Sequence, residues 1–177
     1  MSFSNPAGSA KEDAGSYVKA LLEVLGDRDP IGILDDIIPQ IESLTRKVSP
    51  ENLRRPEAPG KWSIIHVVQH LADTDLVVGY RIRKILAEDN PAIEGYDQDR
   101  WAARLHYERA ELKEAIMQLR GVRTGNLRVI RSLSEKERAR TGIHAERGPE
   151  SVWRLTELAA AHDLVHRNQI ARIKSKL

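Results

Sequence analysis

Apolar side chains recur every three to four residues along four long stretches of the chain, which is the spacing of helices that bury one face. These stretches cover residues 30–48, 63–87, 108–133 and 151–174. Asp29-Pro30 begins the first of them, with an N-cap followed by proline at the first helical position. No segment alternates apolar and polar residues between hairpin turns, so no sheet is predicted. The pattern therefore predicts an all-α fold, a four-helix bundle.

The remaining segments predict a short extra N-terminal helix and long connecting loops. Residues 12–25 form the short helical pattern, which stops at Gly26. Residues 49–62 contain three prolines and a glycine and predict a loop that crosses one end of the bundle. Connections of this length permit more than one bundle topology.

Two further connections and the N-terminal arm complete the predicted organisation. Residues 88–105 read as a structured connection with a short amphipathic piece around Trp101, and residues 134–150 read as a polar connection. Residues 1–10 are rich in Ser, Gly, Pro and Ala and predict a flexible arm. We therefore expect a single domain over residues 11–177.

Composition narrows the possible functions. Apolar residues make up 41% of the chain, and no run approaches the ~20 residues of a membrane span, so no membrane partner is expected. The start lacks the apolar core of a secretory signal, which predicts a cytoplasmic protein. The net charge is only +2 and the charges are interleaved, which argues against nucleic-acid binding as the main function.

The absence of cysteine limits the chemistry that the chain can perform by itself. With no cysteine, the chain has no disulfide, no thiol nucleophile and no thiolate metal ligand. A metal ion would therefore need His, Asp or Glu ligands.

Histidines supply the main candidate site. Of six histidines, two pairs have i, i+4 spacing within predicted helices: His66 with His70, and His162 with His166. That spacing places both rings of a pair on one helix face. His162 and His166 share the apolar stripe of the last helix, so both rings are expected in the core, where His70 can meet them. Unpaired burial would cost about 1–3 kcal/mol for each ring, and a shared metal ion would avoid that cost.

Spacing alone leaves an alternative open, in which these are core histidines satisfied by carboxylates or water. Asp73 and Asp163 are available for that role, or for orienting metal-bound imidazoles, or they are solvated surface carboxylates. His66 is a weaker ligand candidate that fits a supporting position. His106 and His144 lie in connections and are expected to be solvated, although His144 could overhang the bundle mouth.

Three segments in order resemble the DinB/YfiT-like family of metalloenzymes. They are PGKWSIIHVVQHLADTD (residues 59–75), PAIEGYDQDRWA (residues 91–102) and HDLVHRNQI (residues 162–170). The resemblance covers roughly residues 50–174, and the middle segment is similar to the YfiT-like branch. It departs from that branch at Gln69-His70, where members tend to have two histidines, and at Asp75, where they tend to have another.

The resemblance implies a specific ligand set. In that family one histidine of the second helix and two of the last bind a divalent ion, usually nickel or zinc, in a four-helix bundle. Carried over, the ligands are His70, His162 and His166. The resemblance also implies a homodimer and, for some members, a low-molecular-weight thiol cosubstrate such as bacillithiol or mycothiol. Other members carry only the label of metal-dependent hydrolases.

Three functional hypotheses follow. Three imidazoles leave a coordination position open, as in catalytic sites. The first hypothesis is transfer of a small thiol to an electrophilic small molecule, with a metal-bound thiolate as nucleophile. The second is hydrolysis by metal-bound hydroxide, which would need Asp73, His66 or His144 as a base. The third is a non-catalytic, stress-related metal-binding protein.

Three aromatic residues lie at junctions between loops and helices. Trp62, Tyr96 and Trp101 are expected either to line the pocket or to anchor loops by packing.

Overall fold

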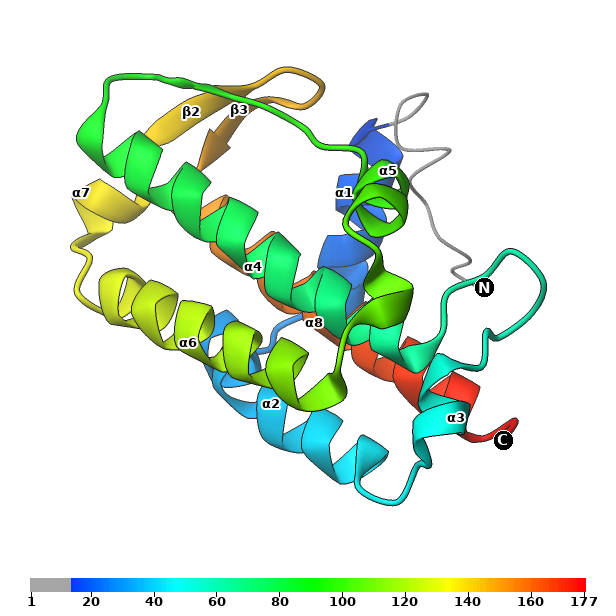
Figure 1. Cartoon of the computed structure of the whole chain (residues 1–177). Coiled ribbons are helices and arrows are strands. Elements are labelled where there is room, and N and C mark those ends of the chain that lie inside the picture. Colours follow the sequence, from blue (N-terminus) through cyan, green and yellow to red (C-terminus); the bar gives the residue numbers. More distant parts are fainter. Residues whose placement is uncertain (1–13) are drawn as a thin grey trace.

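The computed structural model describes residues 14–177, and four long helices dominate this part of the chain (Figure 1). They are α2 (Pro30–Thr45), α4 (Ile64–Ala87), α6 (Leu112–Arg131) and α8 (Val152–Lys174). The predicted four-helix bundle is confirmed. The predicted flexible arm, residues 1–10, lies outside the described residues.

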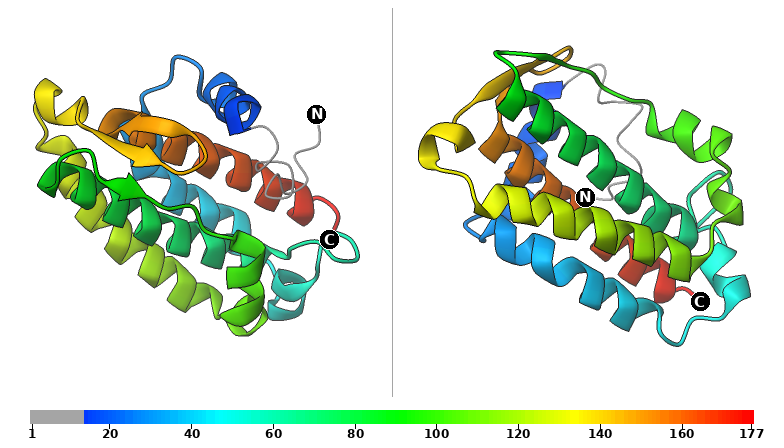
Figure 2. Two further views of the ribbon diagram at one scale, coloured as in Figure 1. Left: turned by 90° about the horizontal axis from the view of Figure 1, so that it is seen from above. Right: turned by 60° about the vertical axis from the view of Figure 1, so that its left-hand side comes forward.

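The packing of the helices settles the topology that the sequence left open. Helices α2 and α4 each pack against both α6 and α8, so α2 and α4 occupy opposite corners of the bundle (Figure 2). The chain therefore crosses a diagonal between α2 and α4, and again between α6 and α8. Helices α4 and α8 are neighbours, which brings the two histidine-bearing helices together.

The beginnings of the helices follow local side-chain chemistry. Asp29 accepts hydrogen bonds from the backbone N–H groups of Ile31 and Gly32 at 3.1 and 2.9 Å, as an N-cap residue does. Ser151 caps α8 in the same way. Ser63 occupies the N-cap position of α4 but makes no capping bond. Its hydroxyl instead lies 2.8 Å from Nδ1 of His66.

Shorter helices fill the connections. They are α1 (Ala14–Leu25), α3 (Pro50–Arg54), α5 (Gln98–Arg104), the 3₁₀ turn η2 (Tyr107–Arg109) and α7 (Glu135–Arg138). The predicted short N-terminal helix is α1, which packs against α8 and ends at Gly26 with φ +58°. Helix α3 corrects the prediction that residues 49–62 are only a loop, because Ser49-Pro50 starts a helix just as Asp29-Pro30 does. None of the described helices combines the length and apolar composition needed to cross a membrane.

A small sheet contradicts the prediction that no strand is present. It contains β1 (Ala92–Ile93), β2 (Thr141–His144) and β3 (Gly148–Ser151), with β1 parallel and β3 antiparallel to β2. Strands of two to four residues are too short to show alternation. The signal for this hairpin in the sequence was Gly148, because its φ of +74° in the hairpin favours glycine. A Cβ at Gly142 would lie 2.9 Å from Ile85 Cγ1, so this glycine lets the hairpin approach α4.

A buried polar layer lies at the centre of the bundle. From α6, Arg123 donates to Asp75 of α4 at 3.0 Å and to Asp163 of α8 at 2.8 Å. It also donates to the carbonyl oxygen of Leu34 in α2 at 2.8 Å. Apolar clusters pack on either side of this layer. One guanidinium therefore connects all four long helices.

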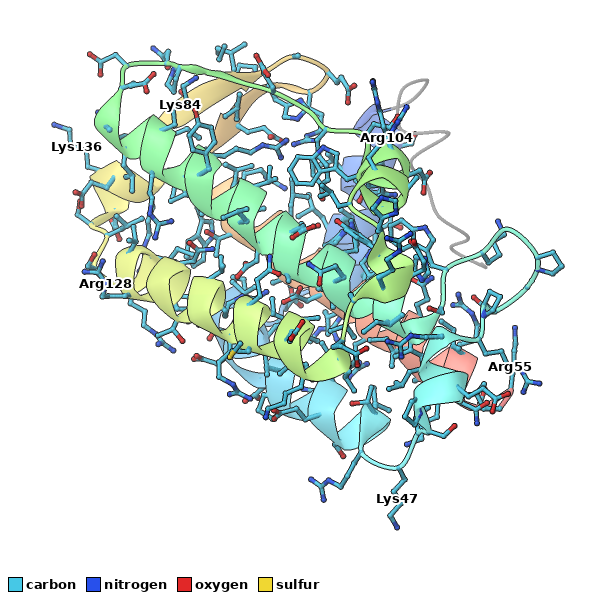
Figure 3. The ribbon with its side chains drawn as sticks, viewed as in Figure 1. Lys47, Arg55, Lys84, Arg104, Arg128 and Lys136 are labelled. Atoms are coloured by element: carbon cyan, nitrogen blue, oxygen red, sulfur yellow. The ribbon has the colours of Figure 1, made fainter. Side chains whose placement is uncertain are left out.

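We expect the Arg123→Met substitution to lower the free energy of unfolding by about 3–5 kcal/mol, because it leaves two buried carboxylates without their cation. Urea denaturation followed by circular dichroism measures this. The matched control is Arg128→Met on the same helix, where the side chain points outward (Figure 3) and the change should stay within about 0.5 kcal/mol. Equal stabilities for the two variants would contradict the structural role of Arg123.

Candidate metal centre

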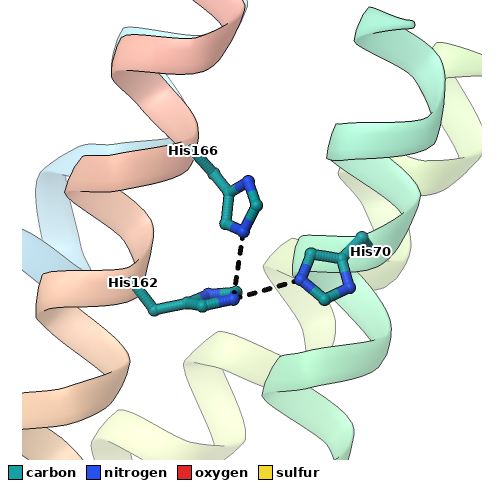
Figure 4. Close-up of side chains that lie close together, drawn as sticks. All are labelled: His70, His162 and His166. Atoms are coloured by element: carbon teal, nitrogen blue, oxygen red, sulfur yellow. Dashed lines mark hydrogen bonds between the residues drawn. The ribbon is translucent and has the colours of Figure 1, made fainter. Parts of the chain in front are cut away.

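Three imidazoles converge between α4 and α8 (Figure 4). Nε2 of His162 lies 3.1 Å from Nε2 of His70 and 3.1 Å from Nε2 of His166. One ligand nitrogen from each ring lies within 4.8 Å of the others. Nitrogens about 2.0–2.1 Å from a tetrahedral zinc ion are separated by about 3.3 Å, so the observed spacing suits one shared ion.

Helix geometry explains why these rings meet. His162 and His166 are one turn apart on α8 and present both rings on the face that packs against α4. His70 is fully buried on the opposing face of α4. The structure thus brings together the three residues predicted as metal ligands, and the binding of an ion by them remains a prediction.

Hydrogen bonding fixes the orientation of one ring. Nδ1 of His166 lies 2.8 Å from Oε1 of Gln169, an amide oxygen that can only accept, so Nδ1 carries the proton. The lone pair of His166 Nε2 therefore points at the other two rings. Gln169 was not singled out in the sequence analysis. Its position three residues after His166 was the available signal.

The other two rings leave buried nitrogen atoms unsatisfied. Nδ1 of His70 and Nδ1 of His162 have no hydrogen-bond partner among the described residues. Three neutral rings cannot satisfy one another fully when their Nε2 atoms all face inward, because each neutral ring has only one N–H group. A divalent cation at the meeting point would accept all three lone pairs, and imidazole nitrogens suit zinc and nickel. The donor set therefore fits a metal ion.

Burial keeps these imidazoles neutral. It lowers the pKa of His70 and of His162 well below the usual 6.5. The pKa of His70 is lowered further by the charged forms of His166 and His162, and that of His162 by His166 and Arg123. Burial likewise lowers the pKa of His166 to about 4, against the opposing effect of Gln169. At neutral pH all three rings are uncharged, which is the form that binds metal ions.

Aromatic and hydroxyl groups surround the cluster. The ring of Trp62 packs against His70 with a centroid separation of 4.9 Å. Thr74 Oγ1 lies 3.4 Å from His70 Nε2 and 2.7 Å from the hydroxyl oxygen of Tyr96, whose ring packs on Trp101. Burial raises the pKa of Tyr96 to about 12, so its hydroxyl stays protonated. Two neutral hydroxyl groups therefore lie beside the cluster.

The candidate carboxylates are engaged away from the imidazoles. Asp73 accepts hydrogen bonds from Tyr107, Gln69 and Gln118, and Asp163 pairs with Arg123. Both are buried, so the interpretation as solvated surface carboxylates is wrong. Their predicted role in orienting imidazoles finds no support in these hydrogen bonds. Of the three clustered rings, only His166 has a side-chain acceptor on its Nδ1, and that acceptor is Gln169.

The remaining histidines lie outside the cluster. His66 is half-buried and bonded to Ser63, which leaves it a supporting residue at most. His106 is exposed beside Glu108, as expected for a loop residue. His144 is the exception, because it is 1% exposed at the end of β2 rather than solvated. Its burial follows from the hairpin that the sequence analysis missed.

Comparison with known proteins identifies the family. The sequence matches the DinB superfamily over residues 34–170, and the chain therefore belongs to it. A protein of Geobacillus thermodenitrificans is 25% identical over 176 residues, covering 98% of this chain and 91% of its own length. One of Oceanobacillus iheyensis is 26% identical over 141 residues, covering 76% and 81%. Both carry the name "Putative metal-dependent hydrolase".

Solved structures share the fold. YfiT from Bacillus subtilis, described as a probable metal-dependent hydrolase with an unusual four-helix bundle topology, aligns with a TM-score of 0.78 at 21% identity, covering 83% of this chain and 85% of YfiT. TT2238, a four-helix bundle protein, aligns with a TM-score of 0.59 at 19% identity, covering 79% and 94%. These similarities support the four-helix bundle and the YfiT-like resemblance.

We expect the metal-free protein to lose stability as the pH falls from about 6.5 toward 4. The three histidines have lower pKa values when folded than when unfolded, so the unfolded chain binds more protons in this window. Urea denaturation of chelator-treated protein at several pH values measures the slope. The His166→Gln variant isolates one contribution and should show a shallower slope. Imidazole ¹⁵N shifts that titrate near 6.5 in the folded protein would contradict the expectation.

Proposed function

We propose that this DinB superfamily member is a metal-dependent enzyme whose single divalent ion is held by His70, His162 and His166. The observation that carries the proposal is the convergence of three neutral Nε2 atoms at one point, two of whose Nδ1 atoms have no other partner. Three protein ligands are typical of a catalytic site. When bound, the ion would supply Lewis-acid activation that lowers the pKa of a coordinated thiol or water.

We propose transfer of a low-molecular-weight thiol to an electrophilic small molecule as the reaction. The sulfur–carbon bond forms as the leaving group departs with its electron pair, and the thiol proton is released to solvent or to the leaving group. The chain contains no cysteine, so the thiol comes from outside. A free thiol has a pKa near 8.5 and is mostly protonated at neutral pH, but a metal ion that lowers this pKa would yield the thiolate without a general base.

The placement of the carboxylates supports this reaction over one that requires a base. Within residues 14–177, the grouped ligand atoms belong to imidazoles alone. Asp73 and Asp163 are occupied by hydrogen bonds from Tyr107 and Arg123. Thr74 and Tyr96 can donate hydrogen bonds to an anionic sulfur or leaving group, because Tyr96 remains protonated. The ring of Trp62 packs against that of His70.

Hydrolysis is the second candidate function. It is favoured by the names of the similar proteins, which describe metal-dependent hydrolases. This reaction would use water in place of the thiol and normally needs a group that accepts its proton. Three bases were considered from the sequence. His66 has its Nδ1 bonded to the Ser63 hydroxyl, and Asp73 is bonded to Tyr107. His144 is buried with its Nδ1 bonded to the backbone of Glu146 and is not one of the three clustered histidines.

We expect His162→Ala to lower the bound metal from about one ion per chain to less than about one tenth of an ion. Loss of a residue that only supports a metal ligand lowers the metal affinity about 10–100-fold, and loss of a ligand itself should cost at least as much. Mass spectrometry of the purified protein measures metal content. His66→Ala is the matched control and should retain the ion, since its ring lies outside the cluster. Full metal content in His162→Ala, or none in the natural protein, would refute the site.

Substrate panels distinguish the two reactions. We expect metal-loaded protein to consume monochlorobimane only when a small thiol is supplied, and His162→Ala to lose this activity together with its metal. Rates are followed by fluorescence against thiol alone and against the chelator-treated protein. Turnover of ester or amide substrates without thiol, with no thiol-dependent reaction, would replace transfer by hydrolysis. Inactivity toward both panels would contradict both reactions.

A further inference from the structure

A second group of buried polar atoms lies where α4 meets the sheet. Arg81 is 8% exposed and donates from Nη2 to the carbonyl oxygen of Glu94, while its Nε has no partner among the described residues. His144 accepts the backbone N–H of Glu146 on Nδ1 at 3.1 Å, so its proton is on Nε2. That Nε2 also lacks a partner within residues 14–177. Two buried N–H donors are therefore without acceptors.

The group also contains a buried guanidinium that makes no ion pair. Arg147 is paired with the buried carboxylate of Glu150 through two hydrogen bonds of 2.7 and 2.8 Å. Among the described residues no carboxylate forms an ion pair with Arg81, although the negative charges of Glu146 and Glu150 lie near enough to oppose the lowering of its pKa by burial and by Arg147. Burial, with the nearby charges of Arg147 and Arg81, lowers the pKa of His144 to about 4, so the ring is a neutral donor. A buried, unpaired guanidinium is costly unless an anion accompanies it.

Arg81 lies on the same side of α4 as the metal centre. It follows His70 by eleven residues, which is about three helical turns or about 16 Å along the axis. Side chains on a helix lean toward its N-terminus, so the guanidinium leans toward Thr74 and His70. Glu94, which accepts from Arg81, lies two residues before Tyr96, whose hydroxyl contacts Thr74. Thr74 and Tyr96 thus lie between the two groups.

We infer that Arg81 and His144 form a binding site for a carboxylate carried by a small molecule that reacts at the metal centre. The reaction at the metal centre rests on the proposed function, whereas binding of a carboxylate by Arg81 and His144 does not require a metal ion. One carboxylate would give Arg81 the direct ion pair that it lacks, whereas the nearby carboxylates of Glu146 and Glu150 disfavour a phosphate dianion. The guanidinium Nε–H and the His144 Nε2–H would donate to its oxygens. The carboxylate belongs to the thiol or to the electrophile.

The first experiment uses chelator-treated natural protein and acetate or succinate as the probe. We expect the Arg81 Nε–H and His144 Nε2–H signals to shift together in ¹H–¹⁵N spectra, with one saturation curve, at constant ionic strength. Acetamide, which is neutral, should leave both signals unchanged. Absence of saturable shifts, or equal shifts with chloride, would overturn the site. Because no metal is present, this result does not depend on the proposed function.

Variants separate binding from structural support. We expect Arg81→Gln to raise the dissociation constant for succinate about tenfold or more. Arg83→Gln is the matched control, because Arg83 is exposed on the same helix, and it should bind as the natural protein does. If Arg81→Gln fails to fold, His144→Gln and the spectra of the natural protein still decide the question. Unchanged binding in folded Arg81→Gln would overturn the assignment.

Metal-loaded protein then identifies which reactant carries the carboxylate. N-acetylcysteine is compared with its amide as the thiol, and 4-(chloromethyl)benzoate with its methyl ester as the electrophile. If Arg81→Gln raises the KM of only the charged thiol, the bound carboxylate belongs to the thiol. If it raises the KM of only the charged electrophile, the bound carboxylate belongs to the electrophile. Equal changes in KM for charged and neutral compounds would indicate that Arg81 has only a structural role, and would overturn the inference that it binds a reactant's carboxylate. Carboxylate binding without any thiol reaction would refute the proposed function and leave the anion site.

Discussion

The guanidinium of Arg123 connects all four long helices, and the arrangement of the three clustered imidazoles depends on it. Its partners are Asp75 and Asp163, which directly follow Thr74 and His162 in the sequence. A hydrogen-bonded ion pair tolerates only small changes in distance, so it fixes how α4 and α8 lie against each other. That spacing decides whether the rings of His70 and His162 meet. Apolar packing alone would allow the helices to slide by fractions of a turn.

Burial also determines which groups near the centre can act. It keeps the three imidazoles uncharged and the Tyr96 hydroxyl protonated, and it holds the nearby carboxylates in hydrogen bonds with other residues. The result is a centre rich in neutral donors and lone pairs but without a free carboxylate among the grouped ligand atoms of the described residues. Such a centre suits a nucleophile that a metal ion can activate by coordination alone.

The small sheet places a second type of chemistry near the first. Its hairpin carries His144 against α4, where Arg81 supplies a guanidinium whose Nε has no partner among the described residues. The close approach needs Gly142, since a side chain there would clash with Ile85. Neutral ligands at one place and an unpaired cation at another would let the protein bind a substrate at two points, which improves orientation as well as affinity.

The sequence by itself determined the four long helices, the inward face of His162 and His166, and the family resemblance that added His70. Those features depend on neighbours within a few residues, because helical periodicity and capping are local. Only the tertiary structure decided the diagonal topology, the pairing of Arg123 with Asp163, the short sheet and the burial of His144. Each of these depends on contacts between residues far apart in the chain. Strands of two to four residues gain their stability from that packing and leave almost no pattern in the sequence.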